Sequence, residues 1–392
     1  MSINDFYFFT PTGKYLRTLL AINFLFDELL AQKPEVLEDI INYYLKVVCS
    51  KEGKKYIFLD EIQKVPYWQD IVKRFYDTRE DIKFFVSGSA SLQIKNSKES
   101  LAGRIFDFYV PVLSFKEFLE MNNIDIKRPE MEFSSLKKIY EEVVHKVTMF
   151  ENMLNKYILR GFPEIAREEN EEFVREYVKS SIIEKIIFED IPSVFETRRR
   201  DVLYSILEYA CKNTSNMIDI SGLAKTLNVN YHTAKLYIFY LQRSFLLDIL
   251  FNYSGSFAKQ LRKNKKVHIA HPSIAFALLN YNESVLDIEE VVSKFIESVV
   301  FQHVRIKNKN VYFWRTPNKD EVDIVLAENG IIPIEVKYKS EIAKRDIKGM
   351  IKFMKRFKIE RGFVITKDVM REEDIDNLKI FYIPAWLFLT CF

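Results

Sequence analysis

Short apolar runs alternate with helical patterns along the first part of the chain. The elements that this pattern predicts are, in order, a strand within Leu19–Phe26, a helix within Val36–Cys49, a strand at Tyr56–Leu59, a helix from Trp68 to Phe75, and a strand at Phe84–Val86. The two later apolar runs are short, as is typical of buried parallel strands. The order strand, helix, strand predicts a doubly wound parallel sheet.

The rest of the chain predicts three further parts. Residues 151–212 have a helical pattern, with charges placed around apolar positions. Residues 213–283 predict a winged helix, in which two short helices, Ile220–Leu227 and His232–Leu241, flank a polar turn. Residues 284–392 predict a helix, strands, a helix and a strand. The predicted fold class is therefore α/β: a P-loop-type parallel-sheet domain over residues 1–150, then a helical region, a winged helix and a second α/β domain.

The composition is that of a soluble globular protein. The chain has 392 residues, 48% of them apolar and 29% charged. No apolar run reaches the roughly 18 residues that cross a membrane. The net charge of +3 confines any nucleic-acid contact to local patches. The three cysteines lie far apart and form no metal or disulfide pattern. Because no signal peptide is recognisable either, we expect a cytoplasmic protein without membrane contact.

The strand Tyr56–Leu59 ends in two carboxylates, Asp60 and Glu61. ATPases need such an arrangement, because the first carboxylate helps to hold Mg²⁺ and the second polarises the attacking water. Asp60 is therefore a candidate metal and cofactor ligand, and Glu61 is a candidate catalytic residue. On its own the signal is weak, and a solvated strand end explains it equally well.

These carboxylates belong to a longer series of motifs. Phe58–Val65, followed by Trp68, resembles the Walker B segment of a prokaryotic family of AAA-type P-loop ATPases. The further motifs that carry the resemblance are Val86–Ser89 (a strand-end sensor), Leu101–Arg104 (a Gly-Arg element), Pro111–Phe118 (P-L-S-F-x-E) and Gly161–Glu164 (a helical-region signature). They occur in family order over most of the chain. The resemblance implies Mg²⁺ and ATP as cofactors.

The resemblance also implies roles for three side chains. Ser87 or Ser89 would donate a hydrogen bond to the γ-phosphate or to the attacking water. Arg104 would neutralise phosphoryl charge, in cis or from a neighbouring subunit of a homo-oligomer. The sequence leaves the oligomeric state open. Judged without the resemblance, Ser87–Ser89 is an ordinary turn and Arg104 is a surface cation.

The phosphate-binding loop of this family has no recognisable counterpart. Its pattern is G-x-x-x-x-G-K-[ST], because backbone amides and a lysine cradle the phosphates. Gly13-Lys14 is followed by Tyr15, and Phe8 stands where the first glycine is needed. Asn23, in the predicted first strand, follows Lys14 by only nine residues, too few for the usual intervening helix. We therefore expect the N-terminal strand and P-loop to be missing and ATP to bind poorly, which argues against autonomous hydrolysis.

The winged-helix segment carries a candidate surface for duplex DNA, since the second helix of such motifs docks in a major groove. The predicted outward residues of that helix are Tyr231, Thr233, Lys235 and Tyr237, and the inward ones are Ala234, Ile238 and Leu241. Further basic residues are Lys259, Arg262, Lys263, Lys265 and Lys266, in a stretch from Ile249 to Asn282 that has no acidic residue. With Lys235 they predict phosphate contacts. A winged helix used for packing or protein contact is the alternative.

The C-terminal part carries the D…E-x-K pattern. Glu321–Leu326 alternates polar and apolar residues, and Ile331–Lys337 follows an Asn-Gly turn, which predicts a hairpin. Asp323 and Glu335 would hold Mg²⁺, and Lys337 would orient water or steady phosphoryl charge. Glu297, on an upstream helix, is a further candidate ligand.

This part also resembles the C-terminal domain of the same ATPase family, which shows a W-R…E-V-D…I-E-V-K pattern. Trp314-Arg315, Glu321–Asp323 and Ile334–Lys337 stand in that order. The resemblance implies a PD-(D/E)xK nuclease-like fold, although a fold can persist without its catalytic activity. A hairpin with solvated charges is the alternative.

Three functions compete on this sequence. The first is an ATP-dependent switch that acts on or near DNA. The second is a metal-dependent DNA nuclease with a structural ATPase-like domain. The third is an ATP-independent DNA-binding or regulatory adaptor.

Overall fold

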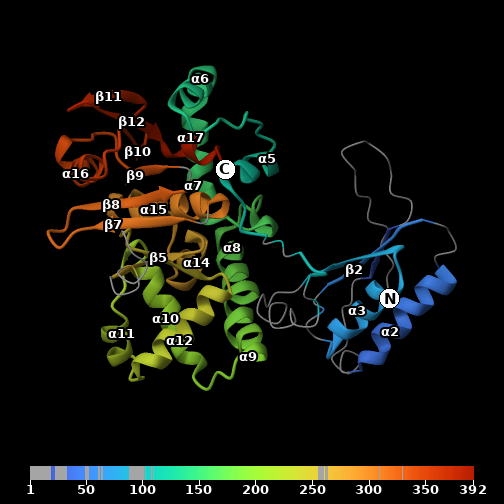
Figure 1. The fold of residues 1–392 in the computed structure, drawn as a ribbon. Helices are drawn as coiled ribbons and strands as arrows, with labels where there is room; N and C mark the ends of the chain where they lie inside the picture. Colours follow the sequence, from blue (N-terminus) through green and yellow to red (C-terminus); the bar gives the residue numbers. More distant parts are fainter. Residues whose placement is uncertain are drawn as a thin grey trace. The chain divides into compact units, whose positions relative to one another are not determined.

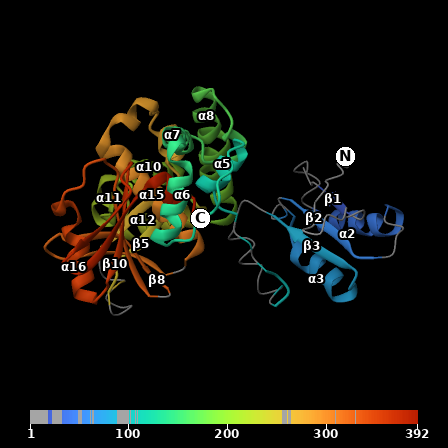
Figure 2. The ribbon, with the colours of Figure 1, turned by 90° about the horizontal axis from the view of Figure 1, so that it is seen from above.

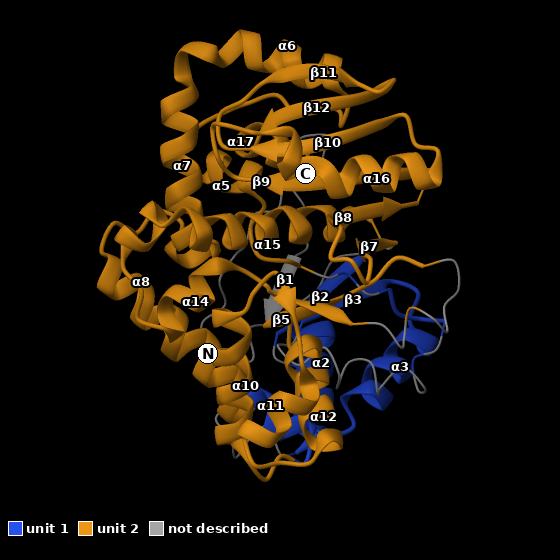
Figure 3. Ribbon diagram, turned by 90° about the vertical axis from the view of Figure 1, so that its left-hand side faces the viewer, with its two compact units in different colours: residues 1–109, 190–196 blue, residues 110–189, 197–392 orange. Residues whose placement is uncertain are grey.

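A computed structural model shows two compact units (Figure 3). One unit comprises residues 1–109 and 190–196, and the other comprises residues 110–189 and 197–392. The structure describes residues 33–48, 53–60, 62, 65–87, 101, 103–106, 108, 110–254, 260, 264–308, 310–328 and 330–392, and the backbone of residues 19–22.

The first unit is built on a parallel sheet. Its described elements are β1 (Leu19–Ile22), α2 (Pro34–Tyr43) with a π-helical turn after it (Tyr44–Val48), β2 (Lys55–Leu59), α3 (Trp68–Thr78), β3 (Ile82–Val86) and α9 (Ile191–Val194). The strand order is β1-β2-β3, and both pairings of the central β2 are parallel. The prediction that Asp60 follows a central parallel strand, next to the strand that ends at Ser87, is therefore confirmed (Figure 2).

Helices α2 and α3 both pack on one face of this sheet. Ile57 of β2 points into that face and joins Leu37 of α2 and Trp68 of α3 in one buried cluster. On the other face Phe58 and Phe85 stack with their ring centroids 4.5 Å apart, and Phe85 keeps 40% of its surface exposed. Within the described residues, the helices expected of a doubly wound sheet therefore cover only one face.

The second unit begins with helices and a small antiparallel sheet. Its first helices are α5 (Phe115–Met121), α6 (Phe133–Val143), α7 (Val147–Leu159) and α8 (Glu171–Tyr177), with π-helical turns at Val178–Glu184 and Ile186–Asp190. Then come α10 (Arg200–Lys212), β4 (Asn216–Met217), α11 (Ile220–Thr226), α12 (Tyr231–Arg243), β5 (Leu247–Phe251), β6 (Lys265–Ile269) and α14 (Pro272–Leu278). The strand order is β4-β6-β5. The two predicted short helices are confirmed as α11 and α12.

A mixed sheet of six strands forms the C-terminal part. Its elements are α15 (Glu289–Lys307), β7 (Val311–Arg315), β8 (Glu321–Ala327), β9 (Ile331–Lys337), α16 (Lys348–Phe357), β10 (Arg361–Thr366), β11 (Arg371–Ile375), β12 (Leu378–Pro384) and α17 (Ala385–Leu389). The strand order is β11-β12-β10-β9-β8-β7 (Figure 1). β9, β10 and β12 are parallel, and the remaining neighbours are antiparallel. The predicted hairpin of β8 and β9 is confirmed.

Two helices hold the strands that carry the D…E-x-K residues. α16 contributes Met350, Phe353 and Met354 to a buried cluster with Val325 of β8 and Val364 of β10. α15 contacts β6, β8 and β9, so it joins the small antiparallel sheet to the mixed sheet. None of the described helices is both long and apolar enough to cross a lipid bilayer.

Residues 110–150, which the sequence assigned to the ATPase core, group with the second unit in the structure. Trp386 of α17 stacks on Phe150 of α7 with ring centroids 4.7 Å apart. The Phe115 amide of α5 donates a hydrogen bond to His303 Nε2 of α15 at 2.9 Å. The segment from α5 to α7 is therefore packed against the C-terminal α/β part.

Candidate functional sites

Asp60 and Ser87 meet at the carboxyl edge of the parallel sheet. The Ser87 hydroxyl donates a hydrogen bond to Asp60 Oδ1. The backbone ladder continues past the strand ends, because the Ser87 amide donates to the Leu59 carbonyl at 2.9 Å and the Ile62 amide donates to the Ser87 carbonyl at 3.2 Å. Both Asp60 and Ser87 are exposed to solvent. A carboxylate and a hydroxyl at this edge suit a hydrated Mg²⁺ and a phosphate oxygen.

Several predicted site residues lie outside the described residues. They are Gly13, Lys14, Glu61, Ser89, Lys259, Arg262 and Lys263. Their roles stay predictions.

Arg104 is not brought to Asp60 within the chain. Its Nε lies 2.8 Å from Oδ1 of Asp77, in the last turn of α3. A helix that connects two parallel strands runs back from their carboxyl edge to their amino edge. Arg104 therefore lies near the end of α3 that is remote from Asp60. The expected contact with phosphate in cis has no support here, and a role in a neighbouring subunit stays a prediction.

The second helix of the predicted winged helix is α12. Its residues Ala234, Ile238 and Leu241 are buried, as predicted, and Lys235 is exposed. Tyr237, predicted to face outward, is only 5% exposed, and its hydroxyl accepts a hydrogen bond from the Arg199 amide at 3.3 Å. That part of the prediction is wrong, because the tyrosine ties α12 to the start of α10.

Lys235 and Lys265 lie close together on this part of the chain. Lys265 begins β6 and is partly exposed. Burial lowers the pKa of Lys265, and repulsion from the Lys235 ammonium lowers it further. The two lysines thus form the described part of the basic patch.

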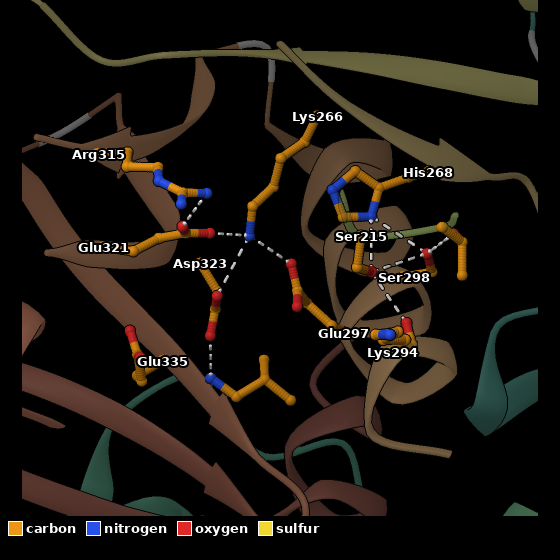
Figure 4. A network of polar contacts seen from close by, with 12 residues as sticks. Ser215, Lys266, His268, Lys294, Glu297, Ser298, Arg315, Glu321, Asp323 and Glu335 are labelled. Carbon is orange, nitrogen blue, oxygen red and sulfur yellow. Dashed lines mark hydrogen bonds and ion pairs between the residues drawn. The ribbon is translucent and has the colours of Figure 1, made fainter. Parts of the chain in front are cut away.

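Lys266 does not belong to the basic patch. Consecutive residues of a strand face opposite sides, so Lys266 points inward where Lys265 stays partly exposed. Its side chain is 2% exposed and reaches the D…E-x-K residues (Figure 4). The predicted contact of Lys266 with DNA is wrong for this structure, because its ammonium is enclosed by carboxylates.

The D…E-x-K residues converge where β8 and β9 separate. Beyond the last residues paired in register, Asp323 Oδ2 accepts the Val336 amide at 3.0 Å. Lys337 Nζ lies 2.6 Å from Glu335 Oε1 and 3.5 Å from Asp323 Oδ2. The structure therefore brings Asp323, Glu335 and Lys337 together, with both carboxylates almost fully buried.

Lys266 completes this cluster from the neighbouring sheet. Its Nζ lies 2.8 Å from Glu297 Oε1, 2.5 Å from Glu321 Oε1 and 3.2 Å from Asp323 Oδ1. The second oxygen of Glu321 lies 3.0 Å from Arg315 Nη1. Figure 4 shows the Lys266 ammonium between these three carboxylates. We call the seven side chains the carboxylate–lysine cluster: Lys266, Glu297, Arg315, Glu321, Asp323, Glu335 and Lys337.

The cluster has four carboxyl groups and three cationic groups, so one negative charge is in excess if all are ionised. Burial raises the pKa of Glu297 to about 8, with repulsion from Asp323 adding to the shift and Lys266 opposing it. Burial and repulsion from Asp323 raise the pKa of Glu335 in the same way. Burial disfavours the Lys266 ammonium, but the carboxylates around it raise its pKa well above the ordinary value. The cluster therefore keeps Lys266 charged and retains a carboxyl proton near neutral pH.

This arrangement does not suit a divalent metal while Lys266 is in place. In the part of the chain that the structure describes, no group of three or more His, Cys, Asp or Glu side chains is arranged to hold a metal ion. Carboxylate oxygens are ligands that Mg²⁺ prefers. However, the Lys266 ammonium occupies the space between Glu297, Glu321 and Asp323. This arrangement gives the predicted Mg²⁺ site no support, and a metal ion bound by Asp323, Glu335 and Glu297 stays a prediction.

A buried polar network adjoins Lys266 on the same face of β6. His268 Nδ1 lies 3.1 Å from Ser298 Oγ, which lies 2.6 Å from Thr214 Oγ1. Burial, with repulsion from Lys266 added, lowers the pKa of His268 well below its usual value, so the ring is neutral. Its Nε2 is buried without a hydrogen-bond partner.

Sequence reasoning missed that Lys266, Arg315 and Glu321 belong to this cluster. A signal for Lys266 was available, because strand alternation places it on the same face as the apolar-flanked His268 and away from Lys265. A lysine that faces a core needs carboxylate partners. No signal in the sequence indicated which carboxylates these would be.

Two of the family-like motifs serve packing in this structure. Ser114 caps α5: its hydroxyl accepts the Glu117 amide at 3.3 Å, and Glu117 Oε2 accepts the Ser114 amide at 2.8 Å. Gly161 lies against His271, where a Cβ would be 2.2 Å from the imidazole ring. The P-L-S-F-x-E and Gly-Phe-Pro-Glu motifs thus fix the helical part of the second unit.

A parallel sheet with an acidic strand end occurs in P-loop-type α/β ATPases, and the comparison with known families agrees with such a domain. Residues 11–119 match the family described as "AAA domain". Residues 151–285 and 293–388 match two families described as domains of unknown function, DUF8612 and DUF4143. The N-terminal part of the chain is therefore similar to AAA-type ATPase domains, and most of the remainder is similar to these two domains of unknown function.

The chain is similar to proteins of archaea and bacteria. It is 26% identical over 334 residues to the uncharacterized protein MJ1544 of Methanocaldococcus jannaschii, and the aligned segment covers 82% of this chain and 70% of the relative. It is 27% identical over 346 residues to MJ1637 of the same organism, covering 85% and 70%. It is 22% identical over 343 residues to an uncharacterized protein of Haemophilus influenzae, covering 86% and 78%.

Proposed function

We propose that this ATPase-family protein is an ATP-dependent switch that acts on or near DNA. The observation that carries the proposal is the hydrogen bond from the Ser87 hydroxyl to Asp60, made at the carboxyl ends of two adjacent parallel strands. Ligands of open α/β sheets collect at this edge. Both side chains are exposed, so a ligand can reach them.

The chemistry of this edge follows from its two groups. Mg²⁺ bound with ATP neutralises phosphate charge. Asp60 would hold that ion, and Ser87 orients the Asp60 carboxylate and offers a hydroxyl to a phosphate oxygen. The sequence has no recognisable P-loop pattern, so we expect the affinity for ATP to be weaker than micromolar.

Support for action on DNA comes from the segment α10–β6. Its order of elements is helix, strand, two helices and two strands, with the sheet order β4-β6-β5. That order agrees with a winged helix, in which the second helix of the helix-turn-helix pair, here α12, reads DNA. Lys235 and Lys265, which lie close together here, are suited to phosphate contacts.

One observation favours a second candidate, a regulatory adaptor that binds protein through the same helix. Leu236 and Phe239 of α12 keep 44% and 39% of their surface exposed. Exposed apolar side chains on one helix are suited to a protein interface. The nuclease alternative is not favoured, because Lys266 lies among the carboxylates that would hold its metal.

Calorimetry with Mg-ATP tests the nucleotide half of the proposal. We expect weak binding by the full chain and none by Asp60→Asn, because the amide no longer attracts the metal ion. Glu80→Gln, an exposed carboxyl in the turn before β3 at the opposite edge of the sheet, is the matched control and should bind as the unmodified chain does. Equal binding by Asp60→Asn would refute the role of this edge.

Salt-dependent titration with duplex DNA tests the other half. The double variant Lys235→Ala/Lys265→Ala should bind more weakly, and its log–log salt slope should fall by about two, since each lost phosphate contact releases one counterion fewer. Lys137→Ala/Lys138→Ala on α6 removes the same charge elsewhere and should leave the slope unchanged. Unchanged DNA binding in the first variant would favour the adaptor.

A further inference from the structure

We propose that Lys266 supplies the cation of the D…E-x-K site, so that the C-terminal domain recruits no divalent metal, and that removing this ammonium creates a divalent-metal site. The proposal concerns the second unit alone and does not depend on nucleotide or DNA binding. Lys266, which the sequence predicts to contact DNA, is thereby assigned as the counter-ion of the D…E-x-K carboxylates.

The contacts of Lys266 match those of a bound cation. A lysine ammonium has three N–H donors and no acceptor. Lys266 Nζ has three carboxylate oxygens around it, at 2.8 Å from Glu297, 2.5 Å from Glu321 and 3.2 Å from Asp323. The ammonium donates hydrogen bonds to Glu297 and Asp323 and forms an ion pair with Glu321, so three carboxylates compensate its charge.

Burial and tethering make this occupant hard to displace. The Lys266 side chain is 2% exposed, and Phe313 lies beneath the ammonium, with its ring centroid 5.7 Å from Nζ. The lysine is part of β6, and its sheet is joined directly to the mixed sheet, because the Tyr253 amide donates to the Phe313 carbonyl at 2.6 Å. A free metal ion competes with a charge held in place by the fold.

A second observation concerns Glu335, the carboxylate of the cluster that has no ion pair with Lys266. Glu335 Oε2 is buried and has no hydrogen-bond partner, while Glu335 Oε1 contacts Lys337. The residue as a whole is 4% exposed. An unpartnered carboxylate oxygen in the interior is costly, and a cation bound beside it would remove that cost. The cluster therefore contains a carboxylate oxygen that neither lysine satisfies, and this oxygen is available to a metal ion once the Lys266 ammonium is removed.

The test is a titration with Mn²⁺ alone, followed by the loss of the electron paramagnetic resonance signal of the free ion. All proteins are full-length and carry Asp60→Asn, so that Mn²⁺ at the N-terminal edge does not contribute. The variants are Lys266→Met, Lys266→Met/Asp323→Asn, and Lys265→Met as the matched control, which removes the same charge from the adjacent position of β6. The Asp60→Asn chain without further change is the reference.

We expect Mn²⁺ to bind Lys266→Met at least about tenfold more tightly than the reference, with one ion per chain, because the carboxylates then lack their central cation. Asp323→Asn in the same chain should abolish this gain, and Lys265→Met should behave as the reference. The melting temperature of Lys266→Met should also rise with Mn²⁺, which gives a second readout.

Two results would overturn the proposal. One is a stoichiometric Mn²⁺ ion in the reference that is lost on Asp323→Asn, since the native site would then already hold metal. The other is a folded Lys266→Met chain with no gain in affinity. If Lys266→Met does not fold, Lys266→Gln is used in its place, because it keeps hydrogen-bond donors without the charge. The titration of the reference chain decides by itself whether the native site binds metal.

Discussion

The protein has two sites where acidic side chains follow or flank β-strands, and they differ in what surrounds the acids. At the edge of the parallel sheet, Asp60 is exposed and has the Ser87 hydroxyl beside it. In the mixed sheet, Asp323 and Glu335 are 6% and 4% exposed and form ion pairs with two lysines, Lys266 and Lys337. The first site is open to a ligand from solution, and the second is balanced by the protein itself.

This difference teaches that an acidic motif does not reveal its own counter-ion. Buried carboxylates need a compensating positive charge, and either a metal ion or a lysine can supply it. The lysine comes from a segment far from the motif in sequence. The four experiments below compare the exposed edge at Asp60 and Ser87, called the open edge, with the buried carboxylate–lysine cluster, called the closed cluster. They begin with the largest expected effect.

Replacing Lys266 should cost more stability than any other single change in either site. Lys266→Ala leaves three carboxylates without their central cation, and we expect a loss of about 3–5 kcal/mol in the free energy of unfolding. Lys265→Ala, on the outer side of β6, should cost less than about 0.5 kcal/mol. Urea unfolding of both variants measures the difference. Similar losses in the two would mean that the cluster is not a closed site.

The closed cluster should also depend on the backbone that supports Glu321. A Cβ at Gly349 of α16 would lie 2.1 Å from the Glu321 carbonyl oxygen, so Gly349→Ala must displace the start of β8. We expect a loss of about 1–3 kcal/mol, the range of overpacked cores. The atoms nearest to a Cβ at Gly362 are the flexible sulfur atoms of Met350 and Met354 and one carbon of Pro333, all beyond 3.0 Å, so Gly362→Ala should cost less. Thermal unfolding ranks the two variants, and the reverse order would contradict this account.

The closed cluster should give the protein a pH dependence of stability. The folded-state pKa of Glu297 is raised from 4.5 to about 8, so folding favours its protonated form. Its contribution to stability is complete below pH 4.5 and is lost as the pH rises towards 8. Glu297→Gln mimics the protonated form and should flatten this decline by up to about 1.4 kcal/mol per pH unit.

Urea unfolding from pH 5 to pH 8 measures that slope. Glu289→Gln makes the same substitution at the exposed start of α15 and should leave the slope as it is. A slope unaffected by Glu297→Gln would show that this carboxyl does not hold the excess proton of the cluster.

The open edge should tolerate substitution with little loss of stability. Asp60 and Ser87 are exposed, so Asp60→Asn and Ser87→Ala should each change the free energy of unfolding by less than about 0.5 kcal/mol. Chemical unfolding provides the measurement. A loss as large as that of Lys266→Ala would make Asp60 a structural residue and remove the contrast between the two sites.

The local elements around both sites could be predicted from the sequence, because short-range patterns determine them. Apolar runs gave β2 and β3, and the spacing of Asp323 and Glu335 gave the hairpin. The convergence of Asp323, Glu335 and Lys337 followed from strand geometry alone. These are inferences over a few residues, where alternation and turn chemistry decide the structure.

The occupant of the closed cluster could not be predicted in the same way. In the sequence Lys266 stands beside Lys265, and neighbouring basic residues predict a patch, although a strand places them on two faces. Its three acceptors come from α15 and β8, and only the packing of β6 against those elements brings them together. Tyr237 was misplaced for a similar reason, because its partner, the Arg199 amide, lies at the start of another helix.

The packing of α17 has a consequence for how the second unit assembles. Trp386 fills the core between helices that were completed more than two hundred residues earlier, and it stacks on Phe150 of α7. Contacts between such distant positions form late and slow the search for the native state. During synthesis, the apolar faces of α5 and α7 therefore lack their final partner until the ribosome has delivered residues 385–389. We expect this stretch of nascent chain to be the part that most depends on chaperones.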